Sequence, residues 1–109
     1  MKILLDENVP HKLRLDLGGG DKIFTVQFMD WFGKKNGELL GLMTLNGFDV
    51  LITLDKNLRF QQNLNRFPIS IILLDVENGK YESIEPLVPR ILKALKSELR
   101  PSEVIIIEP

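Results

Sequence analysis

The chain has 109 residues, enough for one compact domain and too few for two. Its 14 Lys and Arg residues and 15 Asp and Glu residues give a formal net charge of −1, which argues against a generally basic surface for nucleic acid but permits a local basic patch. The absence of cysteine excludes disulfides, Cys-ligated zinc, iron–sulfur clusters and thiol catalysis. Apolar runs are too short for a signal peptide or a membrane span, so we expect a cytoplasmic protein.

Short apolar runs rich in β-branched residues alternate along the chain with segments of helical period. Several runs are continuously apolar, which is typical of strands covered on both faces. In chain order, the predicted strands are Ile3–Leu5, Lys22–Phe28, Val50–Leu54, Ile69–Leu74 and Val104–Ile107.

Four segments between the strands have apolar residues at helical spacing. Asn8 and Asn36 are the expected N-caps of the first two helices, and Gly18-Gly19-Gly20 is expected to end the first. The predicted helices are Val9–Leu17, Glu38–Leu45, Leu58–Leu64 and Val88–Leu99. This alternation predicts right-handed crossovers and a single three-layer α/β domain over residues 1–109, with a mainly parallel sheet of about five strands.

Three acidic residues are expected at the carboxyl edge of this sheet, where ligands bind in open parallel sheets. Asp6 follows the first strand, Asp55 follows the third, and Glu38 lies in the first turn of the helix after the second. Three converging carboxylates repel one another unless a cation lies between them, and oxygen ligands suit Mg²⁺ or Mn²⁺. The alternative is that these residues only terminate strands and favour a helix N-terminus, and spacing alone leaves both interpretations open.

Residues 1–10 (MKILLDENVP), 35–40 (KNGELL) and 54–58 (LDKNL) together resemble the small PIN-like proteins of bacteria, a family related to the VapC-type ribonucleases. The resemblance covers essentially the whole chain. It implies a PIN-like fold and a metal-dependent nuclease site in which Asp6, Glu38 and Asp55 are the acids. Many relatives carry a fourth acid where this chain has Asn57, which keeps a coordinating carbonyl oxygen without the charge. Asp75 is either a substitute for that acid or a surface residue.

Basic and aromatic residues near the predicted edge suggest a site for RNA. Aromatic rings stack on bases and lysines attract backbone phosphates, which makes Trp31, Lys34 and Lys35 candidates. Lys56 and Arg59 follow Asp55 closely and are candidates for neutralising phosphate. The alternatives are a hydrophobic lid with solvated lysines, and counter-charges for the acidic edge.

Two functions follow as hypotheses. The first is a metal-dependent endoribonuclease that is the toxin of a toxin–antitoxin pair, with RNA as substrate, a co-encoded antitoxin as partner, and a homodimer as a possible assembly. The second is a catalytically inactive PIN-like module that binds RNA or protein, which the asparagine at position 57 favours. A phospho-receiver domain is rejected, because Leu74-Asp75 and Glu108-Pro109 occupy the positions where a receiver has Ser or Thr and then Lys.

Overall fold

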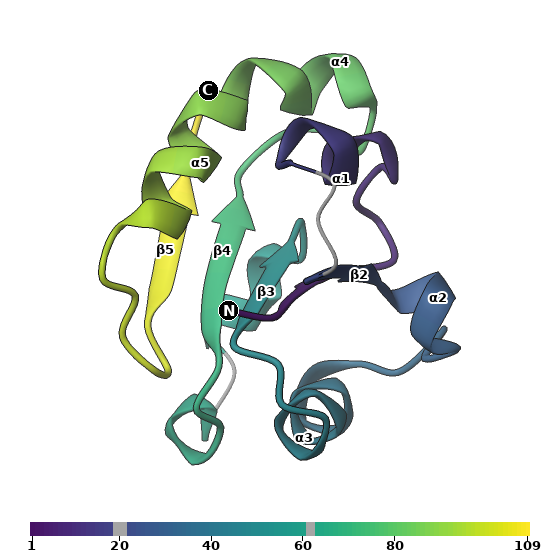
Figure 1. Ribbon diagram of the computed structural model, residues 1–109, viewed down its shortest axis with the longest axis vertical. Coiled ribbons are helices and arrows are strands. Elements are labelled where there is room, and N and C mark those ends of the chain that lie inside the picture. The colour runs from purple at the N-terminus through teal and green to yellow at the C-terminus, as the bar shows by residue number, and fades with distance from the viewer. Residues whose placement is uncertain (19–21, 61–62) are drawn as a thin grey trace.

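A five-stranded sheet forms the centre of the computed structural model, which describes residues 1–18, 22–60 and 63–109 (Figure 1). All neighbouring strands are parallel, and the order is β2-β1-β3-β4-β5, a doubly wound arrangement. This confirms the predicted α/β fold with a parallel sheet. The strands are β1 (Ile3–Leu5), β2 (Ile23–Thr25), β3 (Val50–Thr53), β4 (Ser70–Leu74) and β5 (Val104–Ile107).

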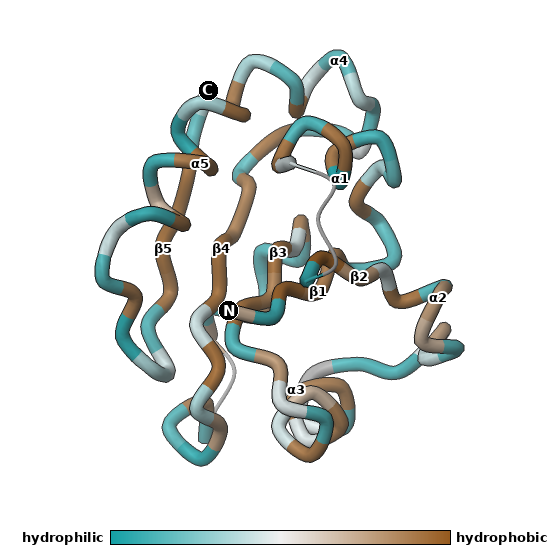
Figure 2. The backbone as a smooth tube through the Cα atoms, in the orientation of Figure 1, coloured by the Kyte–Doolittle hydropathy of each residue, from teal (hydrophilic) through white to brown (hydrophobic). Residues whose placement is uncertain are grey.

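Helices cover both faces of the sheet and complete the three predicted layers. On one face lie α1 (Lys12–Asp16), α4 (Tyr81–Ile84) and α5 (Val88–Lys96), while α2 (Val26–Met29) and α3 (Asn36–Leu45) lie on the other. Figure 2 shows β4 in the hydrophobic colour, as expected for a strand covered on both faces, and the edge strand β5 has the same colour.

Alternating side chains of the strands divide the core into two clusters. Leu5 and Ile52 pack with the α1, α4 and α5 residues, whereas Leu4 and Leu51 pack with α3. Because the side-chain period of a strand is two, the continuous apolar runs of the sequence supply both faces at once.

The boundaries of several elements differ from the prediction. The second strand ends at Thr25, because the Thr25 hydroxyl accepts a hydrogen bond from the Phe28 N–H (3.0 Å) and caps α2. The first helix begins only at Lys12, with His11 as its N-cap, since the chain before it forms a turn in which the Val9 N–H donates to the Asp6 carbonyl (3.0 Å). The N-cap of α3 is Lys35, and Asn36 is the first helical residue.

The prediction of an α-helix over residues 58–64 is also wrong. Two 3₁₀ turns, η1 (Lys56–Phe60) and η2 (Leu64–Arg66), occupy this region, and residues 61–62 lie outside the described part. Gly18 has a φ of +107°, consistent with a helix stop, while Gly19 and Gly20 lie outside the described residues. The last helix, α5, ends at Lys96 and is preceded by α4 and a third 3₁₀ turn, η3 (Glu85–Leu87).

Candidate functional site

A pocket of about 310 Å³ opens at the carboxyl ends of β1 and β3. Strand order reverses between these two strands, because the chain leaves β1 for β2 on one side and returns to β3 on the other. The pocket is lined by Asp6, Glu7, Asn8, Lys34, Lys35, Leu39, Leu40, Leu51, Asp55, Asn57 and Leu58. Two of the three predicted acids, Asp6 and Asp55, therefore share one pocket.

Thr53 connects these two acids. Its hydroxyl donates a hydrogen bond to the Asp6 carboxylate (Oγ1 to Oδ2, 2.7 Å) and accepts one from the Asp55 N–H (3.0 Å). The Thr53 side chain is completely buried at the end of β3. Because the Asp6 N–H also donates to the Ile52 carbonyl (2.9 Å), both the backbone and the side chain of Asp6 are held against β3.

A backbone amide donates a hydrogen bond to each of the two carboxylates. The Glu7 N–H donates to Asp6 Oδ1 (2.8 Å), and the Asn57 N–H donates to Asp55 Oδ1 (3.0 Å). An ionised carboxylate has about four acceptor positions, so both acids keep lone pairs available for a ligand. The two side chains are thus oriented without being saturated.

The Asp6 carboxyl lies in an environment that disfavours its charge. Burial raises its pKa above the ordinary value of 3.8, and the neighbouring charges of Glu7 and Asp55 raise it further, while the hydrogen bonds from Thr53 and Glu7 oppose the rise. In the described part of the chain, neither Asp6 nor Asp55 forms an ion pair. A cation bound between them would relieve this unfavourable interaction.

Glu38 is not brought to the other two acids. Its side chain is 61% exposed on the first turn of α3, and its carboxylate lies 3.8 Å from the Lys34 ammonium instead of lining the pocket. Across residues 1–18, 22–60 and 63–109, no group of three acidic or histidine side chains is close enough to hold a metal ion. Of the three acids expected at one site from the sequence, only Asp6 and Asp55 lie together.

Two of the basic candidates line the pocket. Lys34 and Lys35 lie in the segment that leads into α3, and Lys35 is its N-cap. Trp31, in the same segment, is partly buried and packs edge-on against Phe48 (5.7 Å between ring centroids). This position matches the hydrophobic lid that was the alternative to base stacking.

The other two basic candidates lie outside the pocket lining. The Lys56 ammonium pairs with the Asp75 carboxylate at 3.0 Å, so Asp75 is a partner of Lys56 at the end of β4. The Arg59 guanidinium lies over the ring of Phe60 at 4.6 Å. Both residues are exposed on the η1 turn; Lys56 is a counter-charge for Asp75, whereas Arg59 packs on an aromatic ring.

Sequence reasoning did not single out Thr53 or Glu7 as site residues. One feature of the sequence could have indicated Thr53, because it is the only polar residue in the otherwise apolar strand Val50–Thr53. Glu7 directly follows Asp6 and lines the same pocket. A buried polar residue at the carboxyl end of a parallel strand was therefore as informative as the acids themselves.

No protein-family model, curated protein or solved structure matches the chain significantly. Among the helices of the described residues, none is long and apolar enough to span a membrane.

The raised pKa of Asp6 predicts that its charge destabilises the metal-free protein. The folded-state pKa exceeds the unfolded value, so stability falls as pH rises from about 4 through the folded pKa. At pH 7 in chelator, Asp6→Asn should raise the unfolding free energy by about 1 kcal/mol, and near pH 4 the gain should shrink. Thermal melts of both proteins at the two pH values measure this, and a variant less stable than wild type at pH 7 would contradict it.

The bridging role of Thr53 predicts a specific loss on removing its hydroxyl. Thr53→Val keeps the shape but leaves the Asp55 N–H without its acceptor, which should cost about 1–3 kcal/mol in urea unfolding. Thr53→Ser, the matched control, keeps the hydroxyl and loses one methyl group, at a cost of about 1 kcal/mol. The pKa of Asp6, followed by NMR titration, should rise further only in the valine variant. Equal stability and equal Asp6 titration in the two variants would show that the hydroxyl does not bridge.

Proposed function

We propose that this protein is an endoribonuclease that depends on Mg²⁺ or Mn²⁺, and that it is the toxin of a toxin–antitoxin pair acting in the cytoplasm. One observation carries the nuclease proposal: Asp6 and Asp55 are held together by Thr53 in a pocket that Lys34 and Lys35 also line. The toxin assignment depends on the resemblance of residues 1–10, 35–40 and 54–58 to PIN-like proteins.

The residues of the pocket fit a divalent cation. Mg²⁺ is usually bound by one or two carboxylates together with waters and substrate phosphates, and two neighbouring carboxylates without a counter-ion, that of Asp6 largely buried, meet this requirement. Asp6 and Asp55 would hold the ion, with Asn57 beside them. Bound there, the ion would act as a Lewis acid toward a phosphodiester and lower the pKa of water.

The remaining pocket residues would position the substrate. Lys34 and Lys35 supply positive charge for the RNA backbone, and Glu38 holds Lys34 from outside the pocket. Leu39, Leu40 and Leu51 form an apolar floor, which excludes water and strengthens charge interactions above it. In this arrangement Glu38 acts through Lys34, and the two aspartates carry the cation.

A second function remains in view because of the charge count at the site. Asn57 stands in place of a fourth acid, and Glu38 is paired with Lys34 outside the pocket. The pocket therefore holds less negative charge than a site for two metal ions requires. A PIN-like module that binds RNA through Lys34 and Lys35 without cleaving it fits this observation. The exposed ring of Phe32 (64%), two residues before Lys34, offers an apolar contact for an antitoxin.

Cleavage of single-stranded RNA tests the proposal. With Mg²⁺ or Mn²⁺ the wild-type protein should cleave, and Asp6→Asn and Asp55→Asn should each reduce the rate by about 100-fold or more, because each removes a negative charge and one carboxylate oxygen from the cation site. Glu77→Gln, which neutralises an exposed acid after β4, is the matched control and should retain the activity.

Three results separate the two functions. Cleavage that persists in chelator, or that survives both aspartate substitutions, would contradict the metal-dependent mechanism. RNA binding that is lost in Lys34→Ala, with no cleavage under any metal, would favour the binding module.

A further inference from the structure

β5 is the least covered strand of the sheet. All residues of β3 and β4 are buried, whereas in β5 only Ile107 is buried and Ile106 is 40% exposed. The strand lies at one side of the sheet, alongside α5 (Figure 1). A run of four β-branched apolar residues in a parallel sheet is normally covered on both faces, so part of this surface lacks its cover.

The backbone of β5 also has an open row of hydrogen-bonding groups. The Ile71 N–H donates to the Glu103 carbonyl (2.8 Å) and the Asp75 N–H donates to the Ile107 carbonyl (2.9 Å). In a parallel ladder, alternate residues face the neighbouring strand, so Ile105 also faces β4 while Val104 and Ile106 direct their N–H and C=O groups outward. The strand contains no lysine or proline of the kind that blocks pairing at an edge.

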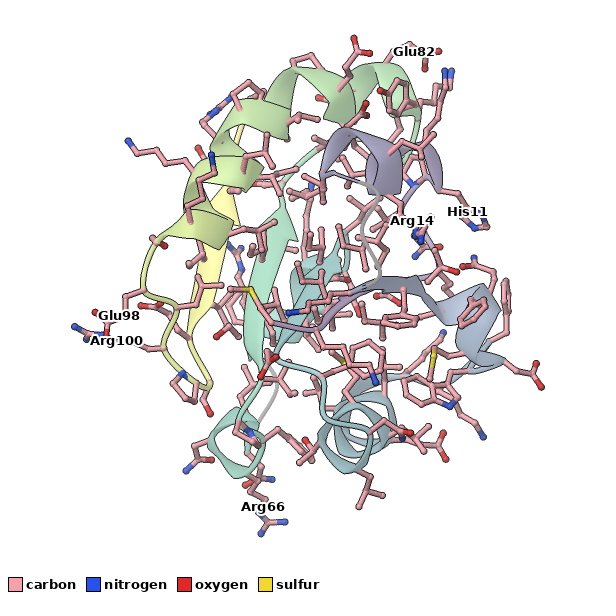
Figure 3. All side chains as sticks on the ribbon, in the orientation of Figure 1. His11, Arg14, Arg66, Glu82, Glu98 and Arg100 are labelled. Carbon is pink, nitrogen blue, oxygen red and sulfur yellow. The ribbon has the colours of Figure 1, made fainter. Side chains whose placement is uncertain are left out.

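The opposite edge of the sheet, formed by β2, is shorter and partly occupied. β2 has only three residues, and the chain turns into α2 directly after Thr25. The Arg14 guanidinium, labelled beside β2 in Figure 3, donates through Nε to the outward carbonyl of Ile23 (2.8 Å). Because β2 is short and its Ile23 carbonyl is already occupied, the β2 edge offers β5 fewer backbone groups than a second β5 does. Head-to-tail growth of a filament is therefore disfavoured, and a closed pair is favoured.

We propose that two copies of this chain pair through β5, antiparallel and centred on Ile105, and join their sheets into one. In this register Val104 lies opposite Ile106 of the second copy, and the two residues exchange both of their outward N–H and C=O groups. Residues directly opposite share a face, so Val104 of one copy covers the exposed Ile106 side chain of the other.

The charges at the ends of β5 are compatible with this register. Glu103 lies opposite Ile107 of the second copy, and Glu108 lies just past the paired segment, where its carbonyl accepts a hydrogen bond from Arg90, so no two carboxylates face each other. The site between β1 and β3 is separated from β5 by β4 and stays open in the pair. The pairing is therefore independent of the proposed nuclease function.

Sedimentation across a range of concentrations tests the pairing. The wild-type protein should shift from 12.5 kDa to twice that mass as concentration rises. Ile106→Lys should raise the dissociation constant at least ~10-fold, because it places a charge in the seam. The control is Leu45→Lys, which changes a more exposed leucine (84%) on α3 and should leave the constant unchanged.

Amide hydrogen exchange on the wild-type protein locates the seam without any substitution. The amides of Val104 and Ile106 should become protected as the concentration rises, while those of Ile105 and Ile107 are protected throughout by β4. A protein that stays monomeric, a dimer that Ile106→Lys does not weaken, or exchange at Val104 and Ile106 that is independent of concentration would each overturn the proposal.

Discussion

The hydrogen bonds of the Thr53 hydroxyl are the interaction on which the candidate site depends. This single buried group donates to the Asp6 carboxylate and accepts from the Asp55 amide, so it joins the ends of β1 and β3 where strand order reverses. Without it, two acids at neighbouring strand ends would be free to turn toward water and away from each other. With it, they stay together in a partly desolvated pocket, which is the condition that favours cation binding.

The distribution of charge around the pocket follows from the same arrangement. Lys34 and Lys56, the lysines that form ion pairs in the described part of the chain, contact the acids outside the pocket, Glu38 and Asp75. These pairs are exposed and contribute little to stability, but they leave the inner aspartates without a cationic partner. A near-neutral chain can therefore hold two neighbouring aspartates that have no ion-pair partner among the described residues.

The sequence predicted the fold and the pairing of Asp6 with Asp55 for one physical reason: parallel strands all end at the same edge of a sheet. The bounds of β1 and β5 were predicted correctly from their apolar runs. The position of the Glu38 side chain could not be predicted in this way. The direction of a side chain on the first turn of α3 depends on how the helix packs on the sheet, and the apolar periodicity does not specify this. The early end of β2 and the 3₁₀ turns after β3 depend on local side-chain hydrogen bonds, which compete with strand pairing. Thr25 accepts from the Phe28 N–H after β2, and Asp55 accepts from the Asn57 N–H after β3.

Titration with Mn²⁺, followed by NMR, tests the central claim most directly. Its paramagnetism broadens amide signals near the bound ion. At substoichiometric Mn²⁺ the signals of Glu7, Thr53 and Asp55 should disappear first, and those of Val104 and Ile106, beyond β4, should broaden only at higher Mn²⁺. In Asp6→Asn this selective loss should vanish. Broadening that begins around Glu38, or that spreads evenly over the acidic surface, would contradict a cation site built on Asp6, Thr53 and Asp55.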